Sequence, residues 1–102
     1  MRVTLSRDAS AFLRHEQRYL EQVNPRAAIT VLQRLRAVLR LLAEQPRAGS
    51  PYQALKGRRR LVSGNYVIDY RIGEAGILVS QIRHGRQDSP ELEASKDNIP
   101  ED

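Results

Sequence analysis

Apolar residues recur every three or four positions in two neighbouring stretches of the chain, the spacing of a helix with one buried face. The first helix is expected to begin after Ser6 or Asp8, either of which can cap it, and to end near Val23. Asn24-Pro25 then starts the second helix, with Asn as the cap and Pro at the first helical position. Since almost nothing separates them, we expect a helical hairpin that packs its apolar side on a sheet. The apolar positions are Ala9, Phe12, Leu13, Leu20 and Val23, then Ala28, Val31, Leu32, Leu35, Val38, Leu39 and Leu42.

Alternating polar and apolar residues predict four strands, at residues 2–6, 58–62, 66–72 and 77–83. Short turns join the last three strands, and a long ordered loop is expected at residues 45–57 because of its prolines and glycines. The third strand should place Tyr66, Ile68, Tyr70 and Ile72 on one face and Val67, Asp69 and Arg71 on the other. The fourth should place Leu78, Ser80 and Ile82 opposite Ile77, Val79 and Gln81.

The predicted fold class is α+β: an N-terminal strand, an α-helical hairpin and then a three-stranded antiparallel meander. The length of 102 residues suits one domain, which we assign to residues 1–87. Residues 88–102 are polar and acidic and contain two prolines, a composition that predicts a flexible tail.

Charge is divided unevenly between these two parts of the chain. Residues 1–87 hold sixteen Lys or Arg and six Asp or Glu, a net charge of +10, whereas residues 88–102 hold one Lys and six acids, a net charge of −5. Fifteen of the seventeen basic residues are Arg, which suits bidentate contacts to phosphate or carboxylate. The bias therefore fits a nucleic-acid surface, an acidic protein partner, or an ordinary solvated surface.

Several kinds of chemistry are excluded or disfavoured by composition and spacing. The chain has no cysteine, which excludes disulfides, thiolate zinc sites and cysteine nucleophiles. Its two histidines have no metal-ligand spacing and its glycines form no phosphate-binding loop, so we expect neither a metal nor a cofactor. No apolar stretch is long enough to span a membrane, and the N-terminus does not resemble a signal peptide, so we expect a cytoplasmic protein.

Three clusters of basic residues are candidate sites. Residues 56–60 place four cations at the start of a strand, with Arg58 and Arg60 on one face and Arg59 on the other; they either protect a sheet edge or bind an anionic partner. Residues 83–87 end the last strand, where His84 could exchange protons beside two arginines or merely bond to a loop carbonyl. Arginines on the helical hairpin most simply form a solvated face.

Taken in order, several segments resemble the RelE/ParE superfamily of type II toxin-antitoxin toxins, over about residues 2–87. In that superfamily a helical hairpin packs on a small antiparallel sheet and an antitoxin wraps the toxin with its C-terminal segment, so the resemblance implies the same fold and partner here. The segments are Val3-Thr4-Leu5-Ser6, Asn24-Pro25-Arg26-Ala27-Ala28, Pro46-Arg47-Ala48-Gly49, Leu55-Lys56-Gly57, residues 64–72 (GNYVIDYRI) and Ile82-Arg83-His84-Gly85-Arg86-Gln87.

The ParE-like branch is the closer one. RelE-like ribosome-dependent mRNA nucleases carry Arg after the Tyr that corresponds to Tyr66 and often a C-terminal Tyr that stacks on the substrate base. This chain has Val67 and no aromatic residue after Tyr70. The resemblance therefore implies a toxin that binds and inhibits DNA gyrase, is not an enzyme, contacts nucleic acid only indirectly, and is neutralised by a cognate ParD-like antitoxin.

Two alternatives stay open: a metal-free endoribonuclease of RelE type, and an inactive remnant or regulatory partner. The catalytic residues of the nuclease would be Lys56, His84 and Arg86. For the gyrase inhibitor, the expected target-binding residues are Arg59, Arg60, Arg83, His84 and Arg86. The expected antitoxin-binding residues are Leu35, Leu39, Arg36, Arg40 and Arg58, where the leucines would supply apolar anchors for an amphipathic segment.

Overall fold

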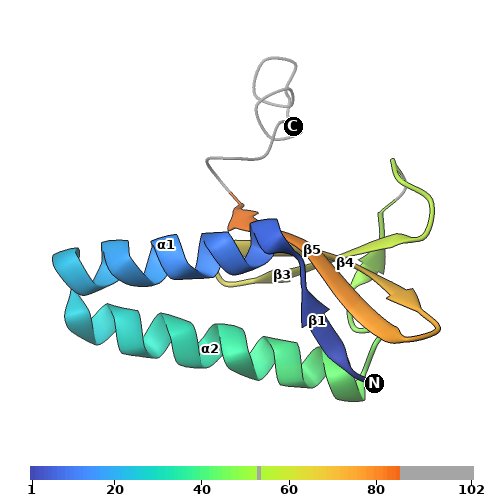
Figure 1. The fold of residues 1–102 in the computed structure, drawn as a ribbon, viewed down its shortest axis with the longest axis horizontal. Helices are drawn as coiled ribbons and strands as arrows, with labels where there is room; N and C mark the ends of the chain where they lie inside the picture. Colours follow the sequence, from blue (N-terminus) through green and yellow to red (C-terminus); the bar gives the residue numbers. More distant parts are fainter. Residues whose placement is uncertain (53, 86–102) are drawn as a thin grey trace.

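A five-stranded sheet packs against a pair of antiparallel helices in the computed structural model of the chain (Figure 1). The structure describes residues 1–52 and 54–85; the predicted tail, residues 88–102, lies outside this part, as does Arg86. The α+β class and the order of a strand, two helices and a meander are as predicted. The elements are β1 (Val3–Leu5), α1 (Arg7–Val23), α2 (Pro25–Glu44), β2 (Ser50–Pro51), β3 (Arg58–Ser63), β4 (Tyr66–Gly73) and β5 (Gly76–His84).

Side-chain caps set the ends of both helices. The Ser6 hydroxyl accepts a hydrogen bond from the Ala9 amide at 3.0 Å, so Ser6 rather than Asp8 caps α1. The amide of Asn24 closes α1, and its side-chain oxygen accepts from the Ala27 amide at 3.2 Å to open α2. A single residue thus ends one helix and begins the next, which forces the tight hairpin that the sequence predicted.

The strands lie in the order β1-β5-β4-β3-β2. The three-stranded meander of β3, β4 and β5 is antiparallel as predicted, and β1 is parallel to β5 at one edge. At the other edge β2 pairs with β3 through two residues, inside the segment that was predicted to be only a loop. Hydrophobic patterning does not reveal so short a strand, because tertiary contacts position it.

The principal tertiary contact of that loop is Tyr70, whose side chain is fully buried. Its hydroxyl accepts from the Gly49 amide at 2.9 Å and donates to the Pro46 carbonyl at 2.7 Å. Gly49 also approaches β3 so closely that a Cβ there would lie 2.7 Å from the Arg60 carbonyl oxygen. One tyrosine on a central strand therefore holds the loop that carries β2.

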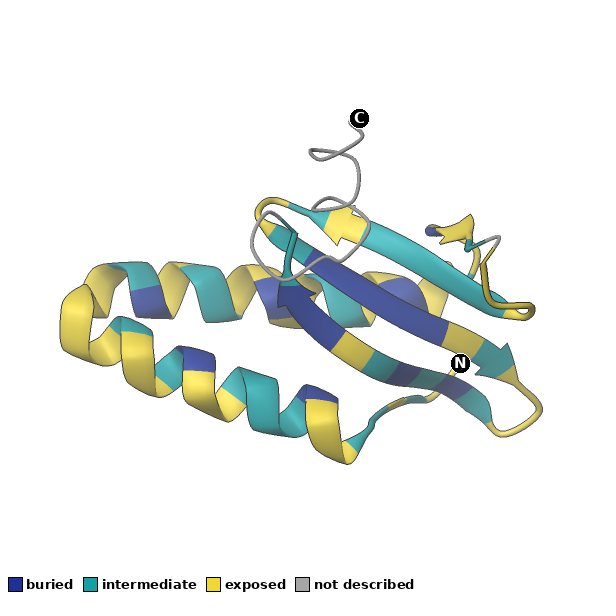
Figure 2. Cartoon of the chain, turned by 90° about the horizontal axis from the view of Figure 1, so that it is seen from above, coloured by how far each residue is buried: buried dark blue, intermediate teal, exposed yellow. Residues whose placement is uncertain are grey.

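The helices cover only one face of the sheet, and the core lies between them. Buried residues run along β4 and β5 and along the sides of the helices that face the sheet (Figure 2). The core residues are Ala9, Leu35 and Leu42 from the helices and Ile68, Tyr70, Ile77, Val79 and Ile82 from the sheet. We call the face that carries these strand residues the helix-covered face and the opposite one the open face.

The predicted alternation is confirmed for β4 but is wrong for β5. Asp69 pairs with Gln81 while Tyr70 pairs with Val79, which leaves Ser80 as an extra, bulged residue. The bulge places Ile82 on the same face as Ile77 and Val79 rather than opposite them. Strict period-two reasoning could not anticipate this, because an inserted residue reverses the faces of everything that follows it.

Candidate functional site

Arginines gather on the open face of the meander. Strand alternation places Arg58 and Arg60 of β3 there and turns Arg59 to the helix-covered face, as predicted. Arg71 of β4 is paired with Arg58, and Arg83 of β5 is paired with Val67. We call the set Arg58, Arg60, Arg71 and Arg83, with Asp69 among them, the arginine face.

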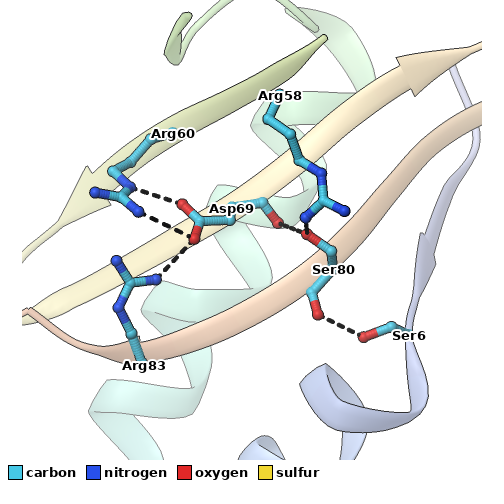
Figure 3. A network of polar contacts seen from close by, with 6 residues as sticks. All are labelled: Ser6, Arg58, Arg60, Asp69, Ser80 and Arg83. Atoms are coloured by element: carbon cyan, nitrogen blue, oxygen red, sulfur yellow. Dashed lines mark hydrogen bonds and ion pairs between the residues drawn. The ribbon is translucent and has the colours of Figure 1, made fainter. Parts of the chain in front are cut away.

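Asp69 is the centre of the arginine face (Figure 3). Its carboxylate accepts from Arg60 at 2.8 and 3.3 Å and from Nη1 of Arg83 at 2.7 Å. Asp69 is 8% exposed and Arg83 5% exposed, so the charge-assisted bond between them is shielded from water. Arg60 also lies over the Tyr52 ring, with its guanidinium carbon 4.1 Å from the ring centroid. The contacts hold two guanidinium groups in fixed positions around one anion.

The bulged residue Ser80 holds a third arginine on the same face. Arg58 reaches across β4 and donates to the Ser80 hydroxyl at 3.0 Å, and that hydroxyl donates to the Asp69 carbonyl at 3.2 Å (Figure 3). The Ser80 carbonyl accepts from the hydroxyl of Ser6 at 2.8 Å. The N-cap of α1 is therefore linked through the bulge to the arginine face.

A second polar cluster lies at the end of the helix-covered face, where β4 begins and β5 ends. Glu16 of α1 is 7% exposed and accepts a short hydrogen bond from the Tyr66 hydroxyl. Nε2 of His84 lies 3.1 Å from the same carboxylate. The Phe12 ring packs edge-on against the rings of Tyr66 and His84, with centroids 6.0 and 5.6 Å away. Phe12, Glu16, Tyr66 and His84 form what we call the Glu16 cluster.

The environment of the Glu16 cluster stabilises the protonated phenol of Tyr66. Burial raises the pKa of Tyr66, and the hydrogen bond to Glu16 and the negative charge of that carboxylate raise it further. Tyr66 thus acts as a hydrogen-bond donor that fixes α1 to the sheet.

The structure divides the predicted target-binding residues among different places. Arg60 and Arg83 meet at Asp69. Arg59 points to the helix-covered side, where it donates to the carbonyls of residues 47 and 49 at 3.2 and 2.5 Å. His84 belongs to the Glu16 cluster, and Arg86 lies outside the described residues. Of the five predicted target-binding residues, Arg60 and Arg83 therefore lie together on one described surface.

The two described residues of the nuclease alternative, Lys56 and His84, are not brought together either. Lys56 is exposed and precedes β3 at the end where Arg58 pairs with Arg71. His84 pairs with Tyr66 at the other end of the strands. The five steps along the strand from Tyr66 to Arg71 span about 17 Å, so Lys56 and His84 lie at opposite ends of the sheet.

The predicted antitoxin-binding residues also separate. Leu35 is 2% exposed and belongs to the core, and Leu39 packs against that core, so both leucines face the sheet. Leu35 is therefore too buried to serve as an accessible anchor, because the stripe that predicted the helix is the stripe that the sheet buries, whereas the partly buried Leu39 stays a predicted contact. Arg36 and Arg40 are exposed on α2, and Arg58 lies on the arginine face.

Sequence reasoning missed a different apolar surface at the tip of the helical hairpin. Tyr19, Val23 and Ile29 are each at least 60% exposed, so the expectation that Val23 belongs to the buried stripe of the first helix is wrong. Ile29 borders a cleft of about 370 Å³ between the helices that also includes Leu32 and Arg36. The signal was available, because Ile29 directly follows Ala28 and falls outside the helical period of the buried stripe.

The described residues contain no group of three or more His, Asp or Glu side chains arranged to hold a metal ion. Within the same part of the chain, neither helix has the length and apolar character that crossing a membrane requires.

Comparison with known proteins yields one family and one fold. The family model for the ParE toxin of the type II toxin-antitoxin system, parDE, matches residues 3–89. Among solved structures, a chain described as the chromosomal ParDE TA system from P. aeruginosa superposes with a TM-score of 0.68 at 20% sequence identity. The alignment covers 82% of this chain and 95% of that chain, and at this identity it shows the fold. No curated protein sequence matches.

Proposed function

The chain belongs to the ParE toxin family of type II toxin-antitoxin systems, and from this premise we propose that it binds and inhibits DNA gyrase and is neutralised by a cognate antitoxin. The family match carries the proposal. The arginine face supports a binding mode of action, since guanidinium groups fixed on a rigid sheet suit carboxylate-rich or phosphate-rich partners.

We place contact with the target on the arginine face. The described residues of that face include four arginines and one carboxylate, so the face keeps an excess of positive charge. Arg60 and Arg83 are held by Asp69, whereas Arg71 is exposed at the end of the face nearest the β4–β5 turn. Arg71 is therefore the member that can contact a partner without dismantling the network.

We place contact with the antitoxin on the hairpin tip. Ile29 and the cleft beside it offer an apolar anchor point, and Arg36 in the same cleft offers a cation. An amphipathic segment with apolar and acidic residues has the matching chemistry. Ile29 is exposed to a partner, whereas the previously expected anchor Leu35 is buried in the core.

The mRNA nuclease alternative is disfavoured by geometry. It needs Lys56 and His84 on one scissile phosphate, and these residues lie at opposite ends of the sheet. Mapped cleavage of mRNA after induction of the chain would reverse this preference.

The direct test is a supercoiling assay in which the purified chain is titrated into gyrase and relaxed plasmid, with and without antitoxin. We expect loss of supercoiling or trapped cleaved DNA, reversed by the antitoxin. No effect from the folded chain contradicts inhibition of that gyrase.

Two matched variants locate the contact. Arg71→Gln removes an exposed arginine from the arginine face, and Arg26→Gln removes an exposed arginine from the start of α2. We expect the first to raise the half-inhibitory concentration about two- to fivefold, the size of one exposed charge contact, and the second to leave it unchanged. Equal effects contradict the assignment of the arginine face to the target.

A further inference from the structure

The arginine face carries a net positive charge, and neither helix covers it. Among the described residues of this face, four are arginines and Asp69 is the acid. The helices lie on the other side of the sheet, so the face is open to whatever carries complementary charge. An anionic ligand on this face would meet the exposed Arg71 of β4 and the half-buried Arg58 and Arg60 of β3, while the buried Arg83 adds positive charge from beneath.

The same chain supplies a segment of complementary charge. Residues 88–102 carry six acidic residues and one lysine, and they begin four residues after β5 ends at His84. Fifteen extended residues can span up to about 50 Å, whereas the nine residues of β5 span about 30 Å. The segment is therefore long enough to reach every arginine of the face.

Covalent attachment strengthens this match. A segment joined to its binding surface by a short linker acts at an effective concentration in the millimolar range, so even weak contacts become occupied. A nucleic acid or an acidic peptide from outside the chain has no such advantage.

We propose that the acidic segment of residues 88–102 binds the arginine face of its own chain and competes there with acidic partners. The contact itself does not depend on the gyrase proposal; only the identity of the displaced partner rests on it. In the isolated toxin the acidic segment then covers part of the arginine face, and a partner must displace the segment before the partner can contact the arginines.

A spin label tests the contact in the full chain. Because the sequence has no cysteine, Ser95→Cys provides a single attachment point. We expect the label to broaden the amide signals of Asp69, Arg71 and Leu78, and 0.5 M NaCl, where the Debye length is about 4 Å, to abolish the broadening.

The position of these signals makes the measurement specific. Arg71 and Leu78 are paired near the β4–β5 turn, at the end of the sheet opposite His84. An unbound segment would broaden signals near His84 and would reach Thr30 on the exposed side of α2 as readily as Arg71. Broadening confined to the His84 end, or equal at Thr30 and Arg71, overturns the proposal.

Competition with a free acidic ligand is the second test. A fluorescent hexaglutamate peptide is titrated into two full-length variants that each lose four negative charges. In the first variant, Asn or Gln replaces the matching acid at Asp88, Glu91, Glu93 and Asp97. In the second variant, the same exchange is made at the exposed acids Asp8, Glu21, Glu44 and Glu74.

We expect the first variant to bind the peptide about tenfold more tightly than the unmodified chain and the second less than twofold more tightly. Equal tightening in both variants means that overall charge alone governs binding, and it overturns the proposal. An inactive chain in the supercoiling assay combined with broadening at Arg71 refutes gyrase inhibition and leaves the intramolecular contact standing.

Discussion

Glu16 and Asp69 are both carboxylates with less than a tenth of their surface exposed, and they lie on opposite faces of the same sheet. Glu16 is contacted by a tyrosine hydroxyl and a histidine ring. Asp69 is contacted by two guanidinium groups. The tyrosine and histidine that contact Glu16 are side chains that can be uncharged, whereas the two arginines that contact Asp69 stay cationic at every physiological pH.

The two arrangements suit two tasks. A buried carboxylate that is satisfied by a tyrosine and a histidine needs no further charge, so the Glu16 cluster holds α1 on the sheet. The carboxylate of Asp69 is outnumbered by arginines, so it orients Arg60 and Arg83 and leaves a net positive charge on the open face. Both carboxylates therefore stabilise the fold, and the Asp69 network in addition fixes the orientation of two arginines on the open face.

The largest expected effect comes from Asp69→Asn. The substitution leaves the shielded Arg83 beside a neutral amide, and removing one member of a buried ion pair costs about 3 to 5 kcal/mol. We expect the free energy of unfolding in urea to fall by about 3 kcal/mol, at the lower end because Arg60 is partly solvated. Glu74→Gln, at an exposed position in the β4–β5 turn, is the control and should change stability by less than about 0.5 kcal/mol.

A smaller loss is expected from Glu16→Gln. The amide keeps the shape of the side chain and can still accept a bond from Tyr66, but it loses the charge that strengthens both contacts. We expect about 2 kcal/mol less stability by the same measurement, and no change for the exposed Glu21→Gln on the same helix. A loss equal to that of Asp69→Asn would remove the distinction between the two carboxylates.

The smallest effect concerns alkaline pH and Tyr66. Because its pKa is raised in the folded protein, Tyr66 keeps its proton above pH 10 while the unfolded chain loses it. Stability should therefore fall as the pH rises through and beyond 10, and Tyr66→Phe should flatten that part of the curve while costing about 1 kcal/mol at neutral pH. Thermal unfolding between pH 7 and 11 measures both the loss of stability at alkaline pH and the cost of the substitution at neutral pH. The control Tyr19→Phe, at an exposed position, should behave like the unmodified chain.

Local signals in the sequence predicted most of the fold. The caps at Ser6 and Asn24 and the alternation of β4 are properties of neighbouring residues, and the structure confirms them. The bulge at Ser80 and the strand β2 were missed because each depends on pairing with a distant part of the chain. Ser80 looks like an ordinary strand residue until its register against Asp69 is known.

The candidate site was less predictable. The faces of Arg58, Arg59 and Arg60 followed from alternation. The role of Asp69 did not, because nothing in its neighbours reveals that Arg60 and Arg83 converge on it from the two flanking strands. The pairing of Glu16 is easier to predict from the sequence, because a carboxylate that interrupts an otherwise apolar stripe must be paired when it is buried.

The parallel pairing of β1 with β5 sets the order in which the molecule can assemble on the ribosome. The hydroxyl of Ser6, directly after β1, donates to the carbonyl of Ser80 in β5, and these two residues are 74 positions apart in the sequence. At about 5 to 20 residues per second, on the order of 4 to 15 seconds separate the synthesis of one from the synthesis of the other. Until β5 emerges, α1 lacks the strand on which it mainly packs, and Asp69 lacks Arg83. The arginine face is therefore complete only after β5 has been synthesised.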